Sequence, residues 1–419
     1  MALTLIEYRS SFLQKLLLNF TKSLYGSFFV GKNIGKLIGT VCLLSMLCPL
    51  WVKAEETVEI GIEAPHAVLM EVSTGTVLYE KNAKTAVSPA SVTKIMTMLL
   101  IFEALEENKI KLEDTVVVSE NAASMGGSQV FFEPNEKQTV DTMLKCIAIA
   151  SANDACVAMA EFVSGSEEAF VNKMNQKAKE LGMENTHFVN CNGLDAESHQ
   201  MSAYDVALMS RELITKFPQI HEYCTIWMDT IVHQTAKGSQ EFGLSNTNKL
   251  IRQYEYSTGL KTGSTSEAGF CVSATAKKEN MELIAVIMNG ETSKSRFQDA
   301  VTLLNYGYMN YQIYTDTDAE RTLLDAIPVK GGVETMVPLK YASDFHALLM
   351  NGENVSSIEK RLEFLNEVHA PIEEGQVLGT LAYYYGEKKL GEVEIIAQNS
   401  VELAKYSDYL KRVWLAWMM

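Results

Sequence analysis

The sequence contains few of the residues that build disulfide or zinc frameworks. Only seven cysteines and seven histidines occur among 419 residues. No CxxC pair and no HExxH pattern is present, and five cysteines, an odd set, lie beyond the first 54 residues: Cys146, Cys156, Cys191, Cys224 and Cys271. These absences argue against a disulfide scaffold, a zinc ribbon and a zinc peptidase. We therefore expect neither a metal ion nor another cofactor.

Positive charge is also scarce. The chain has 36 Lys and Arg against 52 Asp and Glu, so its formal net charge is −16. A protein that binds nucleic acid needs a surface that neutralises phosphates, so this composition argues against such a partner. Apolar residues make up 47% of the chain, as in ordinary globular proteins, and its length predicts two folded units.

The first 54 residues differ from the rest in charge and hydropathy. They hold six Lys or Arg and one acid, Glu7, and they include the apolar run Leu37–Trp51. Small residues follow at Val52 and Ala54, so the segment 1–54 reads as a secretory signal cleaved after Ala54. Because it is long for a signal, retention as a transmembrane anchor is the alternative. Both interpretations export the remainder of the chain.

Strand patterns precede and follow a helical region between residues 55 and 317. Ser73-Thr74-Gly75 predicts a hairpin turn, and the apolar segment after Pro89 predicts a deeply buried helix. The predicted strands are His66–Val72, Thr76–Glu80, Leu260–Gly263, Gly269–Ala276 and Met281–Met288, and the predicted helices are Ser91–Glu106, Val140–Ser164, Glu167–Leu181 and Ser295–Tyr311. This order predicts an α+β domain, with a helical lobe beside an antiparallel sheet made from both ends of the domain.

The C-terminal hundred residues have a different texture. Residues 318–398 are short alternating runs cut by turn clusters, which predict a small all-β domain. Residues 399–419 predict an amphipathic helix whose apolar face contains Tyr406, Tyr409, Leu410, Val413, Trp414, Trp417 and Met418. Two tryptophans near the end favour a helix lying on a membrane surface over one packed on the β domain.

Ser91-Val92-Thr93-Lys94 places a lysine one helical turn from a serine. A serine hydroxyl becomes nucleophilic when a neighbouring base removes its proton, and burial would lower the lysine pKa enough for this task. The helix N-terminus adds N–H groups where an oxyanion would form. The same spacing recurs at Ser357 and Lys360, in a polar stretch of the β-rich region, and we interpret that second match as chance.

Two further motifs supply polar groups. Ser151-Ala152-Asn153 offers a hydroxyl for proton relay and an amide for the substrate backbone, although Ser119-Glu120-Asn121 has the same spacing. Lys261-Thr262-Gly263 falls on a predicted strand. There the lysine could steady an anionic or proton-relaying centre, the threonine hydroxyl could bind a carboxylate, and the glycine would let substrate lie against the strand edge.

The three motifs together are far more specific than any one of them. In the order SxxK, SxN and KTG, with 60 residues from Ser91 to Ser151 and 110 from Ser151 to Lys261, they are typical of β-lactamases and penicillin-binding proteins. From about Glu55 onward the chain resembles the low-molecular-mass penicillin-binding D-alanyl-D-alanine carboxypeptidases. The resemblance implies a β-lactamase/transpeptidase-like domain that cleaves the terminal D-Ala-D-Ala bond of peptidoglycan stem peptides through a serine acyl-enzyme.

The resemblance also implies roles for individual residues. Ser91 would be the nucleophile and Lys94 its base, while Ser151 and Asn153 would relay a proton and clamp the substrate. The expected substrate-binding set is Asn153, Lys261, Thr262, Gly263, Ser264 and Arg296. Within this set, the backbone N–H groups of Ser91 and Ser264 would form the oxyanion hole and Arg296 would face the terminal carboxylate. Some relatives carry histidine where Ser264 stands, so only its N–H role is expected.

Export and attachment follow from the same resemblance. The expected partners are stem peptides, β-lactam antibiotics as covalent inhibitors, and a membrane surface under the C-terminal helix. The enzyme would work at the outer face of the cytoplasmic membrane or in the wall space. Two alternatives remain open at this point: a serine β-lactamase, and a non-catalytic protein that binds the wall.

Overall fold

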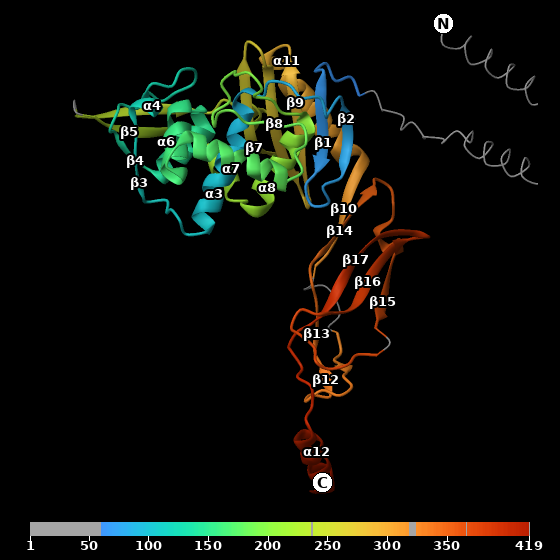
Figure 1. Cartoon of the computed structure of the whole chain (residues 1–419). Helices are drawn as coiled ribbons and strands as arrows, with labels where there is room; N and C mark the ends of the chain where they lie inside the picture. Colours follow the sequence, from blue (N-terminus) through green and yellow to red (C-terminus); the bar gives the residue numbers. More distant parts are fainter. Residues whose placement is uncertain (1–59, 236–237, 318–323, 366, 419) are drawn as a thin grey trace, which may run out of the picture. The chain divides into compact units, whose positions relative to one another are not determined.

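The computed structural model describes residues 60–235, 238–317, 324–365 and 367–418 (Figure 1). The predicted leader, with its cleavage site at Ala54, lies outside these residues. Within them, no helix is both long and apolar enough to span a bilayer. The same ranges hold no group of three or more His, Cys, Asp or Glu side chains placed to bind a metal ion, and the five cysteines beyond residue 54 are free and buried.

The first domain is organised around a five-stranded antiparallel sheet with strand order β2-β1-β9-β8-β7. These strands are β1 (His66–Glu71), β2 (Val77–Lys81), β7 (Ser257–Thr265), β8 (Gly269–Lys278) and β9 (Met281–Gly290). The predicted hairpin turn is present, because the Glu71 carboxylate accepts hydrogen bonds from the Ser73 and Thr74 backbone N–H groups at 2.9 and 2.8 Å. Pairing of β1 with β9 joins the two ends of the domain, as the sequence predicts.

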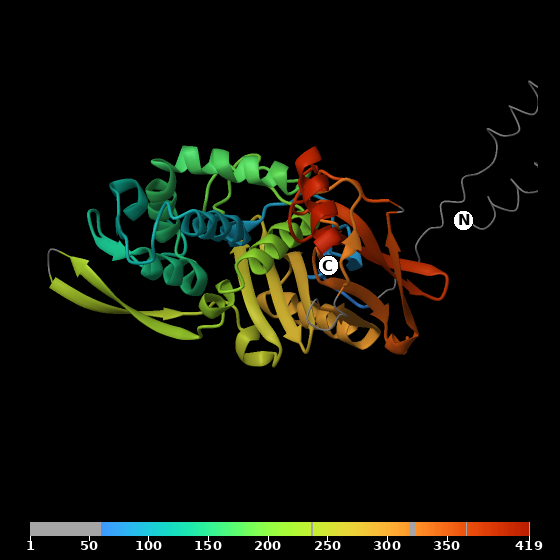
Figure 2. The same cartoon turned by 90° about the horizontal axis from the view of Figure 1, so that it is seen from below.

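The two faces of this sheet bury different sets of side chains. Alternate residues of β1 point to opposite faces, so Val68 and Met70 belong to the core on the side of the helical lobe, whereas Ala67 and Leu69 pack toward a single helix, α11 (Ser293–Asn310). Figure 2 shows α11 on one side of the strands and the helices of the lobe on the opposite side. The lobe helices are α3 (Lys94–Glu106), α4 (Glu120–Ala123), α5 (Val140–Lys145), α6 (Asn153–Ser164), α7 (Glu167–Glu180), α8 (Ala203–Lys216) and α9 (Ile220–Cys224).

The buried helix after Pro89 begins later than the sequence predicts. Residues Ala90–Thr93 form a 3-10 turn, and the α-helix starts at Lys94. Ala90 has φ = 50°, a left-handed conformation that alanine rarely adopts. Every side chain of α3 from Lys94 to Phe102 is buried, so the helix is surrounded by protein on all sides. This burial explains why its sequence shows no polar face.

The predicted helix Val140–Ser164 is interrupted, and this part of the prediction is wrong. After α5 the chain forms a π-helical turn, Cys146–Ala150, and then Ser151 takes a left-handed conformation with φ = 61° before α6 begins at Asn153. The break is stabilised by tertiary contacts, since the Asn153 backbone N–H donates to Ser128 O at 2.7 Å. No Gly or Pro marks it, so a pattern of apolar spacing cannot reveal it.

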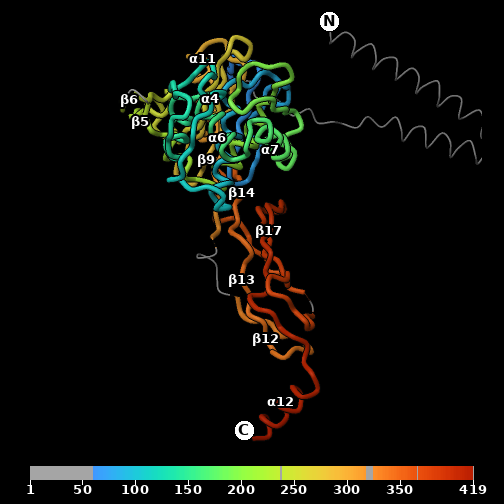
Figure 3. The backbone as a smooth tube through the Cα atoms, turned by 60° about the vertical axis from the view of Figure 1, so that its left-hand side comes forward, coloured from blue at the N-terminus to red at the C-terminus, as the bar shows by residue number. Residues whose placement is uncertain are grey.

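Short strands also occur inside the helical lobe. They form two hairpins, β3 (Thr115–Val117) with β4 (Lys137–Thr139), and β5 (Met228–Thr235) with β6 (Gly238–Ser245). The β5–β6 hairpin projects from the lobe (Figure 3). Its buried His233 contacts the Glu136 carboxylate at 3.0 Å, which ties the hairpin to the segment before β4. A short helix, α10 (Leu250–Gln253), then leads to β7.

The C-terminal part is all-β, as expected. Strand β10 (Tyr311–Asp316) follows α11 directly and pairs with β14 (Phe345–Met350). A four-stranded sheet has the order β13 (Leu339–Tyr341), β17 (Lys388–Ala397), β16 (Val377–Tyr385) and β15 (Ile358–Phe364), and β11 (Ile327–Pro328) pairs with β12 (Met336–Val337). The rings of Phe345 and Tyr383 stack in its core with centroids 3.7 Å apart.

The final helix, α12 (Tyr406–Met418), has no buried residue. Its apolar side chains are exposed, with Trp417 at 87% and Trp414 at 59%. Its contact with the β domain runs instead through Arg412, whose guanidinium donates to the carbonyl oxygens of Gly332 and Val333.

Packing of α11 on the sheet predicts the effect of two matched substitutions. Leu303→Ala should lower the free energy of unfolding by about 2–5 kcal/mol, because it opens a cavity at a fully buried position. Met309→Ala on the same helix, where the side chain is 75% exposed, should change it by less than about 0.5 kcal/mol. Urea unfolding of both variants measures this, and equal effects would contradict the packing of α11.

Candidate active site

The three sequence motifs converge on one cluster of side chains. Lys94 Nζ lies 2.9 Å from Ser91 Oγ and 2.6 Å from Asn153 Oδ1. Lys261 Nζ lies 2.8 Å from Ser151 Oγ. The fold therefore brings together residues that are 60 and 110 positions apart in the chain, and it does so with two Ser–Lys pairs.

Each member of the cluster comes from the end or the edge of an element. Ser91 lies in the 3-10 turn before α3, and Lys94 is the first residue of that helix. Ser151 occupies the left-handed break before α6, and Asn153 opens α6. Lys261 lies on β7, the edge strand of the sheet. The ends of helices and the edge of a sheet leave polar groups free to face a substrate, while the rest of each helix and of the sheet holds these groups in place.

Lys94 is fully buried, and burial lowers its pKa from the ordinary lysine value. Its ammonium group donates to three neutral acceptors, Ser91 Oγ, Asn153 Oδ1 and the backbone carbonyl of Asn192. Two thiols lie nearby, but burial raises the pKa of Cys156 to about 12, so it stays neutral. The charge of Asp154 opposes the effect of burial but is smaller, so the pKa of Lys94 stays below the ordinary lysine value.

Lys261 is also a buried lysine whose pKa lies below the ordinary value. Burial, and then the positive charge of Lys94, lower its pKa to about 7. It donates to Ser151 Oγ and to the carbonyl oxygen of Thr262 at 3.0 Å. Two amines that repel each other's charge and share a buried site can hold and transfer a proton near neutral pH.

Gly263 allows β7 to approach the turn that carries Ser91. A Cβ atom at this position would lie 2.8 Å from Ser91 N and 3.0 Å from Val92 N. The sequence predicts that this glycine clears space for substrate, and the structure adds a second reason, which is close packing against the backbone of the nucleophile turn. Ser264 follows on the same strand, paired with Phe270.

Arg296 is only 6% exposed, so it is a buried residue and not a surface arginine. Its Nη1 donates to the carbonyl oxygens of Gly263 and Cys271 at 2.9 and 3.1 Å, which links the ends of β7 and β8. Burial lowers its pKa to about 10. Its Nε has no hydrogen-bond partner in the described structure, so the guanidinium retains a free donor. Contact with a substrate carboxylate stays a prediction.

Two polar residues of the cluster were not anticipated. Thr247 Oγ1 lies 2.6 Å from Thr262 Oγ1, and Asn192 supplies the backbone carbonyl that accepts from Lys94. Asn192 stands before Gly193, in a stretch of turn-forming residues that could have drawn attention. Thr247 has no comparable signal, because it lies 15 residues before Thr262 and outside every motif.

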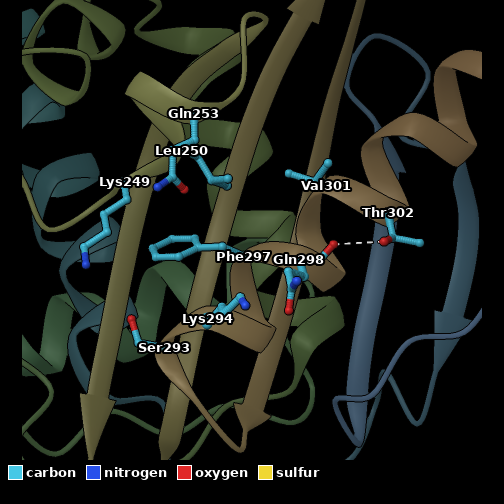
Figure 4. Close-up of a pocket in the computed structure, with 9 residues that line it drawn as sticks. All are labelled: Lys249, Leu250, Gln253, Ser293, Lys294, Phe297, Gln298, Val301 and Thr302. Atoms are coloured by element: carbon cyan, nitrogen blue, oxygen red, sulfur yellow. Dashed lines mark hydrogen bonds between the residues drawn. The ribbon is translucent and has the colours of Figure 1, made fainter.

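Two grooves lie close to β7. One, of about 510 Å³, is lined by residues around Ser88, Asp195 and Glu267; here the Asp195 carboxylate accepts from Ser88 Oγ and Thr265 Oγ1. The other, of about 750 Å³, lies between α10 and α11 (Figure 4). Its Leu250 and Phe297 belong to the core layer on the α11 side of the sheet, so it is separate from the Ser–Lys cluster.

This fold and this pair of Ser–Lys contacts define an acyl-transferring serine enzyme of the penicillin-binding class. Residues 52–292 match the model of the peptidase S11 family, described as D-alanyl-D-alanine carboxypeptidase, and residues 315–403 match the C-terminal domain of penicillin-binding protein 5. The chain belongs to the S11 family of D-alanyl-D-alanine carboxypeptidases. The predicted family and fold class are therefore confirmed.

Individual relatives agree with this assignment. The chain is 44% identical to the D-alanyl-D-alanine carboxypeptidase DacF of Bacillus subtilis, over 87% of this chain and 92% of that protein. It is 32% identical to DacC of Escherichia coli, over 88% and 92%. Among solved structures, penicillin-binding protein 5 of Haemophilus influenzae has a TM-score of 0.70 at 29% identity, covering 81% of this chain and 98% of that one.

The protein is thus a serine-type D-alanyl-D-alanine carboxypeptidase that acts on peptidoglycan. This settles the reaction class against the two alternatives, the β-lactamase and the non-catalytic wall-binding protein. A relative from Listeria monocytogenes, penicillin-binding protein D2, is solved in its cefotaxime-bound form and has a TM-score of 0.52 at 29% identity, over 59% of this chain and 98% of that one. Binding of β-lactams is accordingly a property of the family.

The burial of Lys261 predicts an unusual effect on stability. Lys261→Met should raise the free energy of unfolding at pH 7 by about 1–4 kcal/mol, since an apolar side chain of similar length replaces a buried amine. The amine has a pKa of about 7 in the folded protein and near 10.5 in the unfolded chain. The loss of wild-type stability caused by the buried charge is therefore complete below pH 7 and disappears above about pH 10.5. The stability gained by Lys261→Met, measured by urea unfolding from pH 6 to 10, should therefore be largest at low pH and decrease as the pH rises. A stability gain independent of pH would contradict the prediction.

Proposed function

We propose that Ser91 is the nucleophile of this carboxypeptidase and that Lys94 is its general base. The observation that supports this most directly is the 2.9 Å contact between Lys94 Nζ and Ser91 Oγ in a site where burial lowers the lysine pKa. A neutral amine at hydrogen-bond distance can take the hydroxyl proton as Oγ attacks the carbonyl carbon of the penultimate D-alanine. Asn153 and the carbonyl of Asn192 would hold Lys94 in position.

The oxyanion of the tetrahedral intermediate would be stabilised by the backbone N–H groups of Ser91 and Ser264. Support comes from the close packing at Gly263, the residue before Ser264, where an added Cβ would lie 2.8 Å from Ser91 N. Two N–H groups on separate elements that are held in place before the reaction stabilise negative charge without reorganising. The intermediate would then collapse and release D-alanine.

The leaving amine needs a proton, and the second Ser–Lys pair would supply it. Ser151 Oγ lies 2.8 Å from Lys261 Nζ, whose pKa of about 7 suits both donation and recovery of a proton. Water would later hydrolyse the acyl-enzyme by the reverse route. A β-lactam would acylate Ser91 in the same manner, but its leaving group stays tethered to the acyl part.

Recognition of the peptide would use the edge of β7. The Thr262 hydroxyl and the Arg296 guanidinium are our candidates for the terminal carboxylate, because a guanidinium suits a planar anion. Asn153 Nδ2 donates to Gly126 O at 2.7 Å in the free protein and would exchange this bond for a substrate carbonyl.

The two SxxK sequences provide a matched test of the nucleophile. Ser91→Ala should abolish both D-alanine release from a pentapeptide and covalent labelling by a fluorescent penicillin, because among the described residues no other hydroxyl is hydrogen-bonded to Lys94 Nζ. Ser357→Ala should retain both, since Ser357 ends a surface 3-10 turn before β15. Both activities are measured on the purified chain at pH 7 to 9.

Peptide mapping of the labelled wild type completes this test. The penicillin adduct is expected on the peptide that contains Ser91. An adduct on Ser151, on Ser357 or on any other residue would overturn the assignment, as would D-alanine release that survives in Ser91→Ala.

We further propose that the protein works outside the cytoplasm and lies on the membrane through α12. The basic and apolar segment 1–54 supports export. The exposed aromatic residues of α12 support attachment, because Trp414 and Trp417 remain largely exposed although Arg412 contacts the β domain. The helix would rest at the interface rather than cross the bilayer.

Vesicle binding tests this attachment. A chain lacking residues 1–54 should sediment with vesicles of phosphatidylglycerol and phosphatidylethanolamine, and Trp414→Ala/Trp417→Ala should lose most of this binding because it removes the largest exposed apolar side chains. Phe131→Ala, which removes an aromatic ring that is 63% exposed elsewhere, is the control and should bind like the unsubstituted chain. Full binding by the double variant would contradict the proposal.

A further inference from the structure

A buried chain of hydrogen bonds leads from His199 to the backbone beside the nucleophile. The Val189 backbone N–H lies 2.9 Å from His199 Nδ1, and His199 Nε2 lies 2.9 Å from Thr93 Oγ1. Thr93 Oγ1 in turn donates to Ala90 O at 2.8 Å. His199 is 4% exposed, and Thr93 and Ala90 are fully buried, so water does not compete for the two hydrogen bonds of Thr93 Oγ1.

The partners determine which way each hydrogen points. A backbone N–H can only donate, so His199 Nδ1 must accept from Val189 and the ring hydrogen resides on Nε2. Nε2–H then donates to Thr93 Oγ1, and the single hydroxyl hydrogen of Thr93 is directed to Ala90 O. Burial, with a smaller effect of His187, lowers the pKa of His199 to about 4 and favours this neutral form.

The series of hydrogen bonds ends at a strained peptide group, the one that joins Ala90 to Ser91. Ala90 has φ = 50°, and its carbonyl belongs to the same peptide group as the N–H of Ser91. In a planar trans peptide the C=O and N–H bonds point in opposite directions, so a partner that holds the oxygen also directs the hydrogen. The neighbours pack tightly here, because a Cβ at Gly193 would lie 1.9 Å from Ala90 O.

We propose that His199 and Thr93 are positioning residues that direct the Ser91 N–H into the oxyanion hole by holding Ala90 O. Neither side chain touches substrate or the reacting atoms in this scheme. The inference rests on the proposed function, since it assigns Ser91 N–H as an oxyanion donor. Thr93 belongs to the SxxK motif only as a variable position, so the motif itself does not assign this task.

Matched hydroxyl deletions on α3 and the turn before it test the proposal. Thr93→Val removes the bond to Ala90 O while keeping the shape of the side chain, and Thr93→Ser restores the hydroxyl. Thr97→Val is the control, because Thr97 Oγ1 is equally buried and donates to a backbone carbonyl, that of Cys191, without contacting Ala90. His199→Leu removes the previous link of the same chain.

The measurement is acylation by a chromogenic cephalosporin, resolved into the dissociation constant of the first complex and the rate constant of acylation. Thr93→Val should lower the rate constant by about tenfold or more, less than the ~10²–10³ lost when an oxyanion donor is removed outright. The dissociation constant and the midpoint of the pH profile should stay unchanged, because Lys94 keeps its own contacts. Thr93→Ser and Thr97→Val should acylate at nearly the wild-type rate.

A double variant separates a connected chain from independent packing effects. If His199 acts through Thr93, the rate loss in Thr93→Val/His199→Leu should be close to that of the more damaging single change. Multiplying losses, a shifted pH midpoint, an unchanged rate in Thr93→Val, or equal losses in Thr93→Val and Thr97→Val would each overturn the proposal. Should Thr93→Val fail to fold in urea-unfolding controls, His199→Leu against Thr97→Val decides the matter.

A different result would refute the proposed function itself. It is refuted if wild-type protein carries its label away from Ser91, and that result is obtained before any variant is compared. With Ser91 labelled in the wild type, an unchanged acylation rate in both Thr93→Val and His199→Leu refutes the positioning role alone.

Discussion

The burial of two lysine amines is the constraint on which the rest of the structure depends. Lys94 and Lys261 are surrounded by hydroxyl, amide and carbonyl groups, and no carboxylate forms an ion pair with either among the described residues. Burial without a counter-charge favours the neutral amine, which is the form that accepts a proton. The all-apolar surroundings of α3 and the five-stranded sheet supply the stability that offsets this cost.

Backbone strain accompanies the buried amines. Ala90 and Ser151 both adopt left-handed conformations that are unfavourable for residues with a side chain. Ala90 precedes the proposed nucleophile and packs closely on Gly193, and Ser151 is a proposed proton relay two residues before Asn153, whose N–H donates to Ser128 O. Tight packing around such residues makes the turn before α3 and the break before α6 rigid, so the reacting groups keep their geometry before substrate arrives.

The sequence predicted elements with strong local patterns, and it failed where tertiary contacts override them. The hairpin at Ser73–Gly75 and the three late strands were predicted because turn residues and alternation mark them. The break at Ser151 and the contact of Thr247 with Thr262 were not, since no local pattern encodes a π-turn or a side chain reaching across to β7. The motifs identified which residues meet, and only the fold shows that Arg296 also binds backbone carbonyls.

The second SxxK sequence shows that reactivity comes from the environment and not from the four residues themselves. Lys360 lies on the edge strand β15, and its side chain is 41% exposed and forms an ion pair with Asp316 at 2.8 Å. Partial burial is the largest single effect and lowers its pKa, but the hydrogen bonds and charges of Asp316 and Tyr314 together outweigh burial and raise the pKa. The pKa of Lys94 shifts the opposite way because its full burial dominates and no described carboxylate forms an ion pair with it. A lysine that retains its proton cannot activate Ser357, so the same spacing yields a surface cation at Lys360 and a buried lysine with a lowered pKa, the proposed base, at Lys94.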